Sequence, residues 1–584
     1  MKKEYSIRRE LTNQESDDFK GFSGILSHLM FHRGISSKEA NLFVEPSFSL
    51  GLNDPFLLHD MEKVVKRIIK AIKADEKICI YSDYDADGLS GATIFYDFFK
   101  QINFINFINH IPNRNEEGFG LHIESIEKII KEGVSLIITV DCGIGDIEEA
   151  KFAKKLGVDL IITDHHEPAV HRSSAQNKAD RPDYNLPDAF AIINPKISPD
   201  YPEKMLCGAA VAWKVVCAII SKNEFKLPLG FEKWIMDVVG IATLSDMVPL
   251  VGENRLLSKF GMLVLKKSRR VGIQRLLKTL KIDIQNLTED DIGFMITPRI
   301  NAASRMGKSI DAFRLLTTTS EDEAKEIVLE LEKTNNERKV ISAHLSKEVK
   351  KMMEEKYSPH FSNKVIALGS PNWKPSILGI VAGNIVEKEN KPVFLWGKEE
   401  GSENIKGSCR APEGVSIKEI MENVLPGIII NFGGHHMAGG FSLSNETVHL
   451  FESEIEKAFE TSLSEAKETS EAWVDRKIDI ENVDLKLINE IEKLSPFGMA
   501  NEKPIFILSD GIFEKVDFFG KEKKHLKIIL KGKKGKLIEA ISFFTSEDLI
   551  AKAKQGEKID IVGNVEKSFF GYPKARIRII DILE

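Results

Sequence analysis

Short, strongly apolar runs alternate with helical patterns between residues 61 and 163, and this alternation constrains the fold more than any other feature. The apolar runs span residues 77–81, 103–111, 134–140 and 158–163. The helical patterns span residues 61–74, 89–102, 123–133 and 146–156. Strands that are apolar on both faces are typical of parallel sheets covered by helices on both sides. The alternation therefore predicts an α/β domain built on a parallel sheet.

Acidic and imidazole side chains follow three of these strands directly. They are Asp83, Asp85 and Asp87 after the first strand, Asp141 after the third, and Asp164, His165 and His166 after the fourth. Asp246 follows a later apolar stretch, residues 238–244. Because ligands of open α/β sheets bind beyond the carboxyl ends of the strands, we expect these side chains to share one edge of the sheet.

Each of these groups also has an ordinary structural interpretation. An Asp-x-Asp-x-Asp run is often a solvated turn or a helix cap, Asp141 alone fits another cap, and a His-His pair is more often structural than ligating. Capping does not, however, require every acid to lie at the same sheet edge. Carboxylates packed together repel one another, so a cation is needed to offset their charge.

The ligand types indicate which cation this would be. Carboxylate and imidazole ligands suit Mn²⁺, with Mg²⁺ as the alternative, and the lack of cysteine ligands disfavours structural Zn²⁺. Two such ions that share a carboxylate would activate a water and stabilise a phosphoryl leaving oxygen. The sequence therefore predicts a site for two divalent metal ions.

Three further regions follow this part of the chain. Residues 320–357 contain no Gly or Pro and carry apolar residues at helical spacing among many Glu and Lys, which predicts a long connecting helix. A second α/β segment runs from about 362 to 460 and includes the glycine cluster NFGGHHMAGGFSL. The last 80 residues have short strands separated by turns, typical of a small β-barrel. Residues 171–187 and 464–476 are polar and are expected to form a loop and a linker.

Net charge gives two opposite indications. With 81 Lys+Arg and 88 Asp+Glu, the net charge of −7 argues mildly against a nucleic-acid partner. Residues 505–584, however, hold 16 Lys+Arg and 12 Asp+Glu, a local charge of +4, and residues 521–536 hold eight lysines and one glutamate. Aromatic residues interleave with these lysines: Phe513, Phe518, Phe519, Phe543, Phe544, Phe569, Phe570 and Tyr572.

A basic groove with stacking rings is one way in which such a barrel binds single strands. The alternative is that the rings are buried in the core and the lysines form a solvated hairpin. Neighbouring residues of an extended strand point to opposite faces, so Phe518 and Phe519 cannot both point inward. We therefore expect some of the rings to be available for stacking.

Length, cysteine content and the first residues limit the class of protein. A chain of 584 residues implies roughly three to five domains. Five cysteines without a CxxC pair disfavour a disulfide framework or a zinc ribbon and suit a reducing cytosol. The first residues, MKKEYSIRRELTNQ, lack the apolar stretch of a signal peptide, and the most apolar helical stretch, interrupted by Lys214, is too short to span a membrane. We therefore expect a cytoplasmic protein without a membrane partner.

The ordered motifs of the chain resemble the DHH phosphoesterase superfamily, and closely its RecJ branch, from about residue 55 to the end. Four blocks resemble the metal-binding motifs: DYDADG, TVDCGI, TDHHEP and LSDMVPL. Six more resemble other parts of the branch: IPNRNEEGFGL, LCGAAVAWK, PRINAASRMG, GSCRAP, GGHHMAGG and SPFGMANEKPIF. The resemblance implies an N-terminal segment (1–55), a DHH domain (56–317), a connecting helix (318–358), a DHH-associated domain (359–463), and a linker with an OB-type barrel (464–584).

The resemblance also implies roles for individual residues. The metal ligands would be Asp83, Asp85, Asp87, Asp141, His165, His166 and Asp246. Asp141, His165 and His166 would be the catalytic residues, with Asp141 bridging the ions and Asp164 orienting an imidazole. Ser408, Arg410 and Arg114 would bind a 5′-phosphate. The alternative is that the two arginines form ordinary surface salt bridges. Arg305 and His435 would line the substrate path.

The activity implied is that of a metal-dependent exonuclease that degrades single-stranded DNA from the 5′ end to mononucleotides in repair and recombination. A helicase and a single-strand-binding protein would be candidate partners, and the chain would be a monomer. The alternatives are a DHH phosphodiesterase acting on short oligoribonucleotides and an inactive scaffold of a replication complex. Four positions depart from the family pattern: Lys374 and Ser376 in the usual Trp-His-x-Gly, Ser304 in place of a glycine, and Gly439 in place of an alanine.

Overall fold

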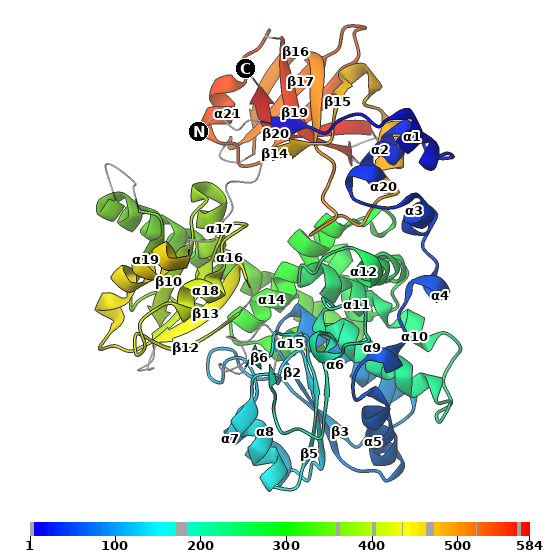
Figure 1. Ribbon diagram of the computed structural model, residues 1–584, viewed down its shortest axis with the longest axis vertical. Coiled ribbons are helices and arrows are strands. Elements are labelled where there is room, and N and C mark those ends of the chain that lie inside the picture. Colours follow the sequence, from blue (N-terminus) through cyan, green and yellow to red (C-terminus); the bar gives the residue numbers. More distant parts are fainter. Residues whose placement is uncertain are drawn as a thin grey trace. The chain divides into compact units, whose positions relative to one another are not determined.

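The computed structural model describes residues 5–170, 184–357, 363–399, 405–434, 436–462, 472–520, 523–556, 558–568 and 574–583. Most of the predicted loop 171–187 and of the predicted linker 464–476 lies outside these residues, as do His435, Phe569, Phe570 and Tyr572. By its contacts the chain divides into two units, shown as ribbons in Figure 1. One unit holds residues 1–52, 249–259 and 469–584, and the other holds residues 53–248 and 260–468.

The second unit begins with the predicted parallel sheet. Its strands are β2 (Ile78–Ser82), β3 (Phe107–His110), β4 (Leu136–Val140), β5 (Asp159–Thr163) and β8 (Ala191–Ile193). They lie in the order β3-β2-β4-β5-β8, and every neighbouring pair is parallel. All residues of β2 and β4 are buried, which explains their continuous apolar sequence.

Helices cover both faces of this sheet. They are α5 (Met61–Lys73), α6 (Ala86–Gln101), α7 (Ile123–Lys131), α8 (Ile147–Lys155) and α9 (Gly208–Ser221). Ile126 of α7 and Ala150 of α8 share a core with Tyr81 and Ile137 of the strands. Ile80 points to the opposite face and is equally buried, and on that side α6 and α9 contact the strands.

A helical region follows the sheet. It begins with two short helices, α10 (Phe231–Trp234) and α11 (Met236–Ser245), which are separated at Ile235. Further helices are α12 (Gly252–Leu265), α13 (Val271–Leu280), the π-helix η4 (Asp291–Ile296), α14 (Thr297–Arg305) and α15 (Ser309–Thr317). The long helix α16 (Glu321–Tyr357, 37 residues) confirms the prediction for residues 320–357.

The second α/β segment contains a mixed sheet. Its elements are β9 (Ile366–Gly369), α17 (Pro375–Glu389), β10 (Val393–Lys398), β11 (Ile405–Arg410), α18 (Ile417–Glu422), β12 (Ile429–Gly434), β13 (Ala438–Leu443) and α19 (Phe451–Ser462). The strand order is β12-β13-β11-β10-β9, in which only β9 and β10 are parallel. Ile405 and Cys409 of β11 point into the core formed with α18 and α19.

The other unit contains the predicted barrel. Its strands are β15 (Arg476–Asp479), β16 (Phe506–Phe519), β17 (His525–Lys531), β18 (Leu537–Ser542), β19 (Lys558–Ser568) and β20 (Lys574–Leu583). The order β15-β16-β17-β18-β20-β19, together with pairing of β16 with β19, closes a five-stranded barrel. Helices α20 (Leu485–Glu492) and α21 (Glu547–Lys552) accompany the strands.

Residues near the N-terminus complete the core of this barrel unit. They form β1 (Tyr5–Ile7), α1 (Asn13–Asp18), α2 (Gly24–His32), α3 (Ser37–Val44) and α4 (Phe48–Gly51). β1 pairs in parallel with β14 (Ala472–Val474). Leu29 and Met30 of α2 are fully buried in one core with Leu508 and Ile528 of the barrel.

No helix among the residues described above is long and apolar enough to cross a membrane. None of the five cysteines, all of which the structure describes, forms a disulfide.

Candidate active site

Two sharp turns at the ends of β2 and β4 position the first acids of the site. Asp83 follows β2 directly, and its N–H donates to Val140 O at 3.0 Å. Asp141 follows β4 directly and adopts a left-handed backbone conformation, φ 63°, which is uncommon for a residue other than glycine. Its carboxylate lies against the start of α9, where a Cβ on Gly208 would be 2.5 Å from Asp141 Cβ. Only glycine at position 208 permits this approach.

Two other acids cap helices and face the same site. The Asp85 carboxylate accepts hydrogen bonds from the N–H groups of Asp87 and Gly88, at the start of α6. The Asp87 carboxylate accepts hydrogen bonds from the N–H groups of Gly208 (2.6 Å) and Ala209 (2.7 Å), at the start of α9. These two acids therefore do cap helices, as the structural interpretation predicts. They also belong to the cluster of acids at the sheet edge.

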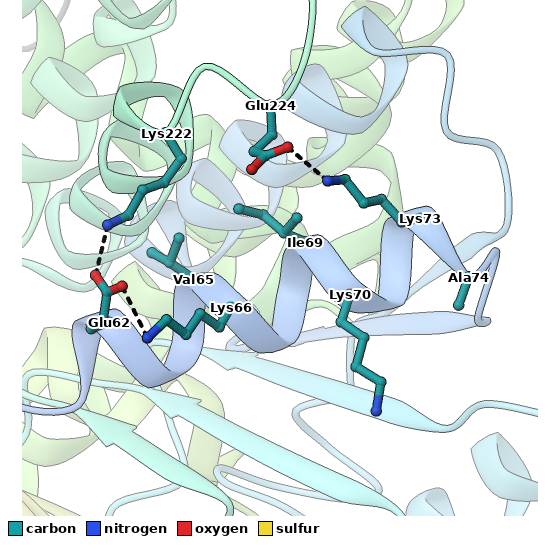
Figure 2. A pocket seen from close by; sticks show the side chains of 9 residues that line it. All are labelled: Glu62, Val65, Lys66, Ile69, Lys70, Lys73, Ala74, Lys222 and Glu224. Carbon is teal, nitrogen blue, oxygen red and sulfur yellow. Dashed lines mark hydrogen bonds and ion pairs between the residues drawn. The ribbon is translucent and has the colours of Figure 1, made fainter.

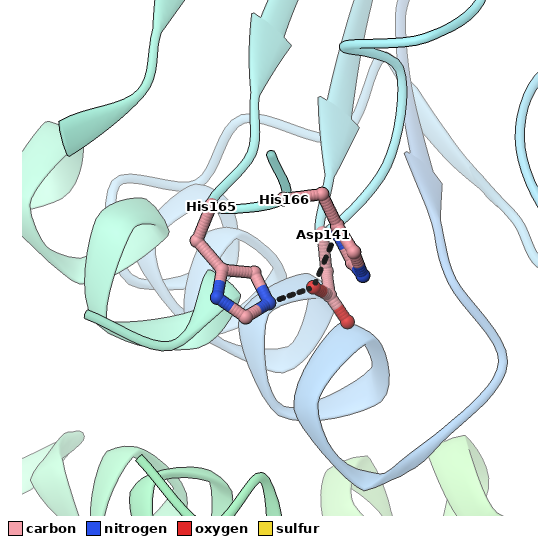
Figure 3. Close-up of side chains that lie close together, drawn as sticks. All are labelled: Asp141, His165 and His166. Carbon is pink, nitrogen blue, oxygen red and sulfur yellow. Dashed lines mark ion pairs between the residues drawn. The ribbon is translucent and has the colours of Figure 1, made fainter. Parts of the chain in front are cut away.

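The structure brings together all seven residues predicted as metal ligands. Their ligand atoms form three groups, each within 4.8 Å: Asp141 with His165 and His166, Asp87 with His165 and Asp246, and Asp83 with Asp85 and Asp141. The groups share Asp141 and His165, so they are continuous. Figure 3 shows His165 and His166 on either side of Asp141, with His165 Nε2 3.1 Å from Asp141 Oδ1.

Two buried carboxylate oxygens of the cluster lack a hydrogen-bond donor. Asp83 Oδ1 and Asp141 Oδ1 accept no hydrogen bond from the described residues. A buried acceptor without a donor costs about 1–3 kcal/mol, and more when it is charged. A cation bound between these oxygens and the neighbouring imidazoles would remove that cost, so the residues fit a divalent metal ion.

Burial and mutual repulsion perturb the pKa values of the acids strongly. Burial, with the charge of Asp85, raises the pKa of Asp83 to about 8 and that of Asp87 to about 7. Burial and the neighbouring carboxylates raise the pKa values of Asp141 and Asp246 well above the ordinary range. These acids cannot all ionise near neutral pH unless positive charge is bound among them.

Asp164 lies behind the cluster and contacts the His166 imidazole and the backbone of His165. Its Oδ1 accepts from the N–H of His165 (2.7 Å) and lies 2.8 Å from His166 Nδ1, while its Oδ2 accepts from the N–H of Ile144 (2.9 Å). Burial alone would raise the pKa of Asp164, but the imidazole of His166 holds it well below the usual range. Burial would likewise lower the pKa of His166, yet Asp164 raises it to about 9. This contact fixes the orientation of the His166 ring, whose Nδ1 also lies 3.8 Å from Asp141 Oδ1.

A cavity of about 670 Å³ joins the acids to the predicted phosphate-binding residues. Its lining includes Asp83, Asp85, His166 and Asp246, and also Arg114, Arg305, Ser408 and Arg410. The structure thus places every described residue of the predicted substrate path next to the predicted metal site.

The three arginines of this cavity form no ion pair with a carboxylate of the described chain. Arg410 Nη1 donates to Cys409 O (2.7 Å) and to Ser408 Oγ (3.2 Å), and Arg305 Nη1 donates to Ser376 O (2.7 Å). The Arg114 guanidinium packs over the Tyr84 ring at 5.0 Å. Burial, with Arg114 and Arg410 nearby, lowers the pKa of Arg305 to about 9. The guanidinium groups of these arginines are therefore not neutralised by salt bridges. A bound anion would reduce the repulsion among the three positive charges.

Sequence reasoning missed the residues that hold the loop bearing Arg114. The Glu117 carboxylate accepts from the Asn113 N–H (2.8 Å) and from Ser125 Oγ, and Asp146 accepts from the Leu121 N–H (2.7 Å). The positive φ angles of Gly118 (98°) and Gly120 (91°) mark a tightly turned loop, and the two glycines were the available signal in the sequence.

A second cavity lies over α5 and has a different character. Figure 2 shows Lys66 and Lys222 directed at Glu62, and Lys73 directed at Glu224. The pairs measure 3.3, 2.7 and 2.6 Å. Because these lysines are already paired and no metal-ligand cluster is present among the residues that line it, this cavity is not a candidate active site.

The barrel presents part of the predicted aromatic surface. Phe513 is buried, whereas Phe518, Phe543 and Phe544 are 40%, 37% and 80% exposed. The His525 ring contacts Phe519, Phe543 and Phe544, and Arg578 packs over Phe543 at 4.5 Å. Several lysines are paired, such as Lys533 with Asp510 and Lys531 with Glu514. Both interpretations are therefore partly correct: some rings are core and some are exposed, and the positive charge is partly compensated.

Comparison with protein families covers most of the chain. Residues 77–243 match the N-terminal domain of the DHH family, residues 362–468 the DHHA1 domain, and residues 474–581 the RecJ OB domain. The single-stranded-DNA-specific exonuclease RecJ of Bacillus subtilis (strain 168) is 32% identical over 569 residues, covering 96% of this chain and 68% of that protein. The single-stranded-DNA-specific exonuclease RecJ of Haemophilus influenzae is 30% identical over 532 residues, covering 87% of this chain and 88% of that protein.

Solved structures give the same result. RecJ of Thermus thermophilus in complex with Mn²⁺ is 24% identical, with a TM-score of 0.80 over 99% of this chain and 79% of that chain, and supports the fold. An exonuclease RecJ bound to manganese is 29% identical, with a TM-score of 0.56 over 68% of this chain and 94% of that chain. From the three domain matches and the full-length relatives, the chain belongs to the RecJ family of DHH proteins.

Proposed function

We propose that this chain is a metal-dependent exonuclease that degrades single-stranded DNA from its 5′ end to mononucleotides in DNA repair and recombination. One observation carries the proposal: a single cavity is lined by four members of the acid–histidine cluster and by three arginines without carboxylate partners among the described residues. The relatives named single-stranded-DNA-specific exonuclease RecJ support the choice of substrate.

The proposed metal ligands are Asp83, Asp85, Asp87, Asp141, His165, His166 and Asp246, which would hold two divalent ions, Mn²⁺ by preference and Mg²⁺ as the alternative. Asp141 is the proposed bridging carboxylate, because it belongs to two of the three ligand groups. When bound, the ions supply Lewis acidity at the scissile phosphate and a more acidic water for attack on it. Asp164 fixes the orientation of the His166 ring beside the cluster.

Arg114, Ser408 and Arg410 are the proposed binding residues for the 5′-terminal phosphate. Guanidinium groups bind phosphate oxygens with paired, charge-assisted hydrogen bonds. Holding the terminal phosphate sets the distance to the next phosphodiester bond, so cleavage would release one nucleotide at a time from the 5′ end. Arg305 and His435 are proposed to line the path of the strand beyond this point.

The barrel is proposed to hold the strand outside the active site. The exposed rings of Phe518, Phe543 and Phe544 offer stacking surfaces, each stacked base contributing about 1–3 kcal/mol. Because such contacts are mostly independent of base sequence and partly ionic, binding is expected to weaken with salt. We further propose that the protein acts as a monomer in the cytoplasm, with a helicase and a single-strand-binding protein as candidate partners.

Digestion of end-labelled oligonucleotides tests the proposal. We expect Mn²⁺-dependent release of mononucleotides from the 5′ end of 5′-phosphorylated single-stranded DNA, with slower loss of duplex DNA, of RNA and from 3′ ends. Asp141→Asn should abolish this activity, because it removes the charge of the shared carboxylate. Equal rates on duplex substrates or from 3′ ends would refute the substrate assignment, and full activity of Asp141→Asn would refute the site.

A further inference from the structure

One residue that faces the cavity belongs to none of the motifs singled out in the sequence. On β11, Ile405 and Cys409 point into the core. Since residues of a strand alternate between its two faces, Lys406, Ser408 and Arg410 share the other face. All three line the cavity that contains the acid–histidine cluster. Lys406 therefore extends the row formed by the two proposed phosphate-binding residues of this strand.

The two ends of this row have different neighbours. A Cβ on Gly379 of α17 would lie 2.8 Å from Ser408 Oγ and 2.9 Å from Arg410 Nη2, so the start of α17 lies against these residues. The same part of α17 holds Arg305, through Ser376. The Arg410 end of the row is thus next to Arg305. Lys406 lies about 6.5–7 Å along the strand from Ser408, at the end away from Arg410.

At this far end, the loop that bears Arg114 approaches β11. A Cβ on Gly118 would lie 3.9 Å from Lys406 Nζ. Gly118 has a φ of 98°, and the hydrogen bonds of Glu117 and Asp146 hold the loop in this turn. Lys406 and Gly118 therefore lie next to each other on the side of Ser408 that lies away from Arg410.

The ammonium group of Lys406 forms no ion pair with any carboxylate that the structure describes. Lys398, on the neighbouring strand β10, does not face the cavity. It lies opposite Ile405 in the sheet, and paired residues point to the same face, so Lys398 points to the core face. Lys406 thus adds a positive charge to the cavity, whereas Lys398 does not line it.

We propose that Lys406 is a specificity-determining residue that contacts the 5′-terminal phosphate from the side opposite Arg410. A phosphate monoester carries a charge of about −1.5 to −2 near neutral pH, whereas a phosphate within a strand carries a single charge. The additional ammonium group therefore favours a terminal phosphate over an internal one. The inference rests on the proposed function, because it assigns the occupant of the same cavity.

Substitution of Lys406 tests this role. Lys406→Met keeps most of the aliphatic stem and removes the charge. We expect kcat/KM for a 5′-phosphorylated oligonucleotide to fall about tenfold, mainly through a higher KM, because one charge-assisted hydrogen bond is lost. The value for the 5′-hydroxyl form of the same oligonucleotide should not change. Lys406→Arg should retain most of the preference, and Lys398→Met is the matched control that should behave as the unsubstituted protein.

The outcomes separate this inference from the proposed function. Loss of preference for the 5′-phosphate in Lys406→Met, with retention in Lys406→Arg, supports it. Equal loss on both substrates, or an unchanged preference, overturns it and leaves the exonuclease assignment intact. If the unsubstituted protein shows no 5′-phosphate preference with Mn²⁺, this inference and the assignment of Arg114, Ser408 and Arg410 to a 5′-phosphate site are both overturned, whereas degradation from 3′ ends would overturn the exonuclease assignment itself. Thermal unfolding of each variant shows whether a loss on both substrates comes from reduced stability.

Discussion

At the scale of single residues, Tyr84 connects the two halves of the active site. It lies between Asp83 and Asp85 of the metal cluster and is only 6% exposed. Its ring supports the Arg114 guanidinium at 5.0 Å, within the range of a cation–π interaction. The spacing between the proposed metal ions and the proposed phosphate site thus depends on an aromatic ring within the metal-binding motif.

Replacing this ring should affect phosphate recognition without removing a metal ligand. Tyr84→Leu removes a contact of about 0.5–2 kcal/mol, so kcat/KM for 5′-phosphorylated DNA should fall roughly 2- to 30-fold. Tyr84→Phe keeps the ring and should be close to the unsubstituted protein. Mn²⁺ affinity, measured by calorimetry, should be unchanged in both variants. A comparable loss in Tyr84→Phe, or weaker metal binding in Tyr84→Leu alone, would contradict this role.

At the scale of secondary-structure elements, a pair of reciprocal hydrogen bonds joins α14 to α17. Arg305 Nη1 donates to Ser376 O, and Ser376 Oγ donates to Arg305 O at 2.9 Å. Ser376 stands where the resembling family usually has a glycine, which has no hydroxyl to offer. Ser304, which also replaces a glycine of the family pattern, does not join two helices. Its hydroxyl donates only to Asn301 O of its own helix, at 3.4 Å.

Ser376→Ala should therefore weaken the connection between the two helices. Loss of one hydrogen bond is expected to lower the free energy of unfolding by about 0.5–1.5 kcal/mol. It should also raise KM for single-stranded DNA more than it lowers kcat, since Arg305 is proposed to bind substrate rather than to react. Ser304→Ala is the matched control. Denaturant unfolding and steady-state kinetics measure both effects, and an equal change in the two variants would rule out a special role for Ser376.

The elements also show how far sequence patterns reach. Strand β2 is predictable because it is a short continuous apolar run, and helix α16 because its apolar residues repeat at helical spacing. The break between α10 and α11 at Ile235 follows no Gly or Pro and has no signal in the sequence. The position of α2 is equally hidden, because its partners Leu508 and Ile528 lie more than 400 residues away along the chain. The acids at the strand ends were predictable, whereas Tyr84, Asp146 and Lys406 act through contacts that only the folded chain creates.

At the scale of the whole molecule, stability is linked to protons at the metal cluster. The pKa values of Asp83 and Asp87 are about 8 and about 7 in the folded protein, against about 3.9 in an unfolded chain. Between these values the folded state binds more protons than the unfolded state. The free energy of unfolding of the metal-free protein should therefore fall as the pH rises from about 4 to about 8.

Metal binding should reverse this trend. Cations replace the protons in the cluster, so stabilisation by Mn²⁺ is expected to grow with pH over the same range. Urea unfolding at about pH 5.5 and about pH 8, with EDTA or with Mn²⁺, measures both effects. The double variant Asp83→Asn, Asp87→Asn should flatten the pH dependence in EDTA. A metal-free protein whose stability rises with pH would contradict the raised pKa values.

The shared core of α2 and the barrel has a consequence for the order of events during translation. Residues 53–468 are made after the N-terminal segment and before most of its barrel partners. At about 5–20 residues per second, the ribosome needs roughly 20–80 s for that stretch. During this time Leu29 and Met30, fully buried in the finished protein, have no barrel to pack against. The apolar residues of α2 therefore stay without their core partners until the barrel has been made, so the N-terminal segment can complete its fold only at the end of synthesis.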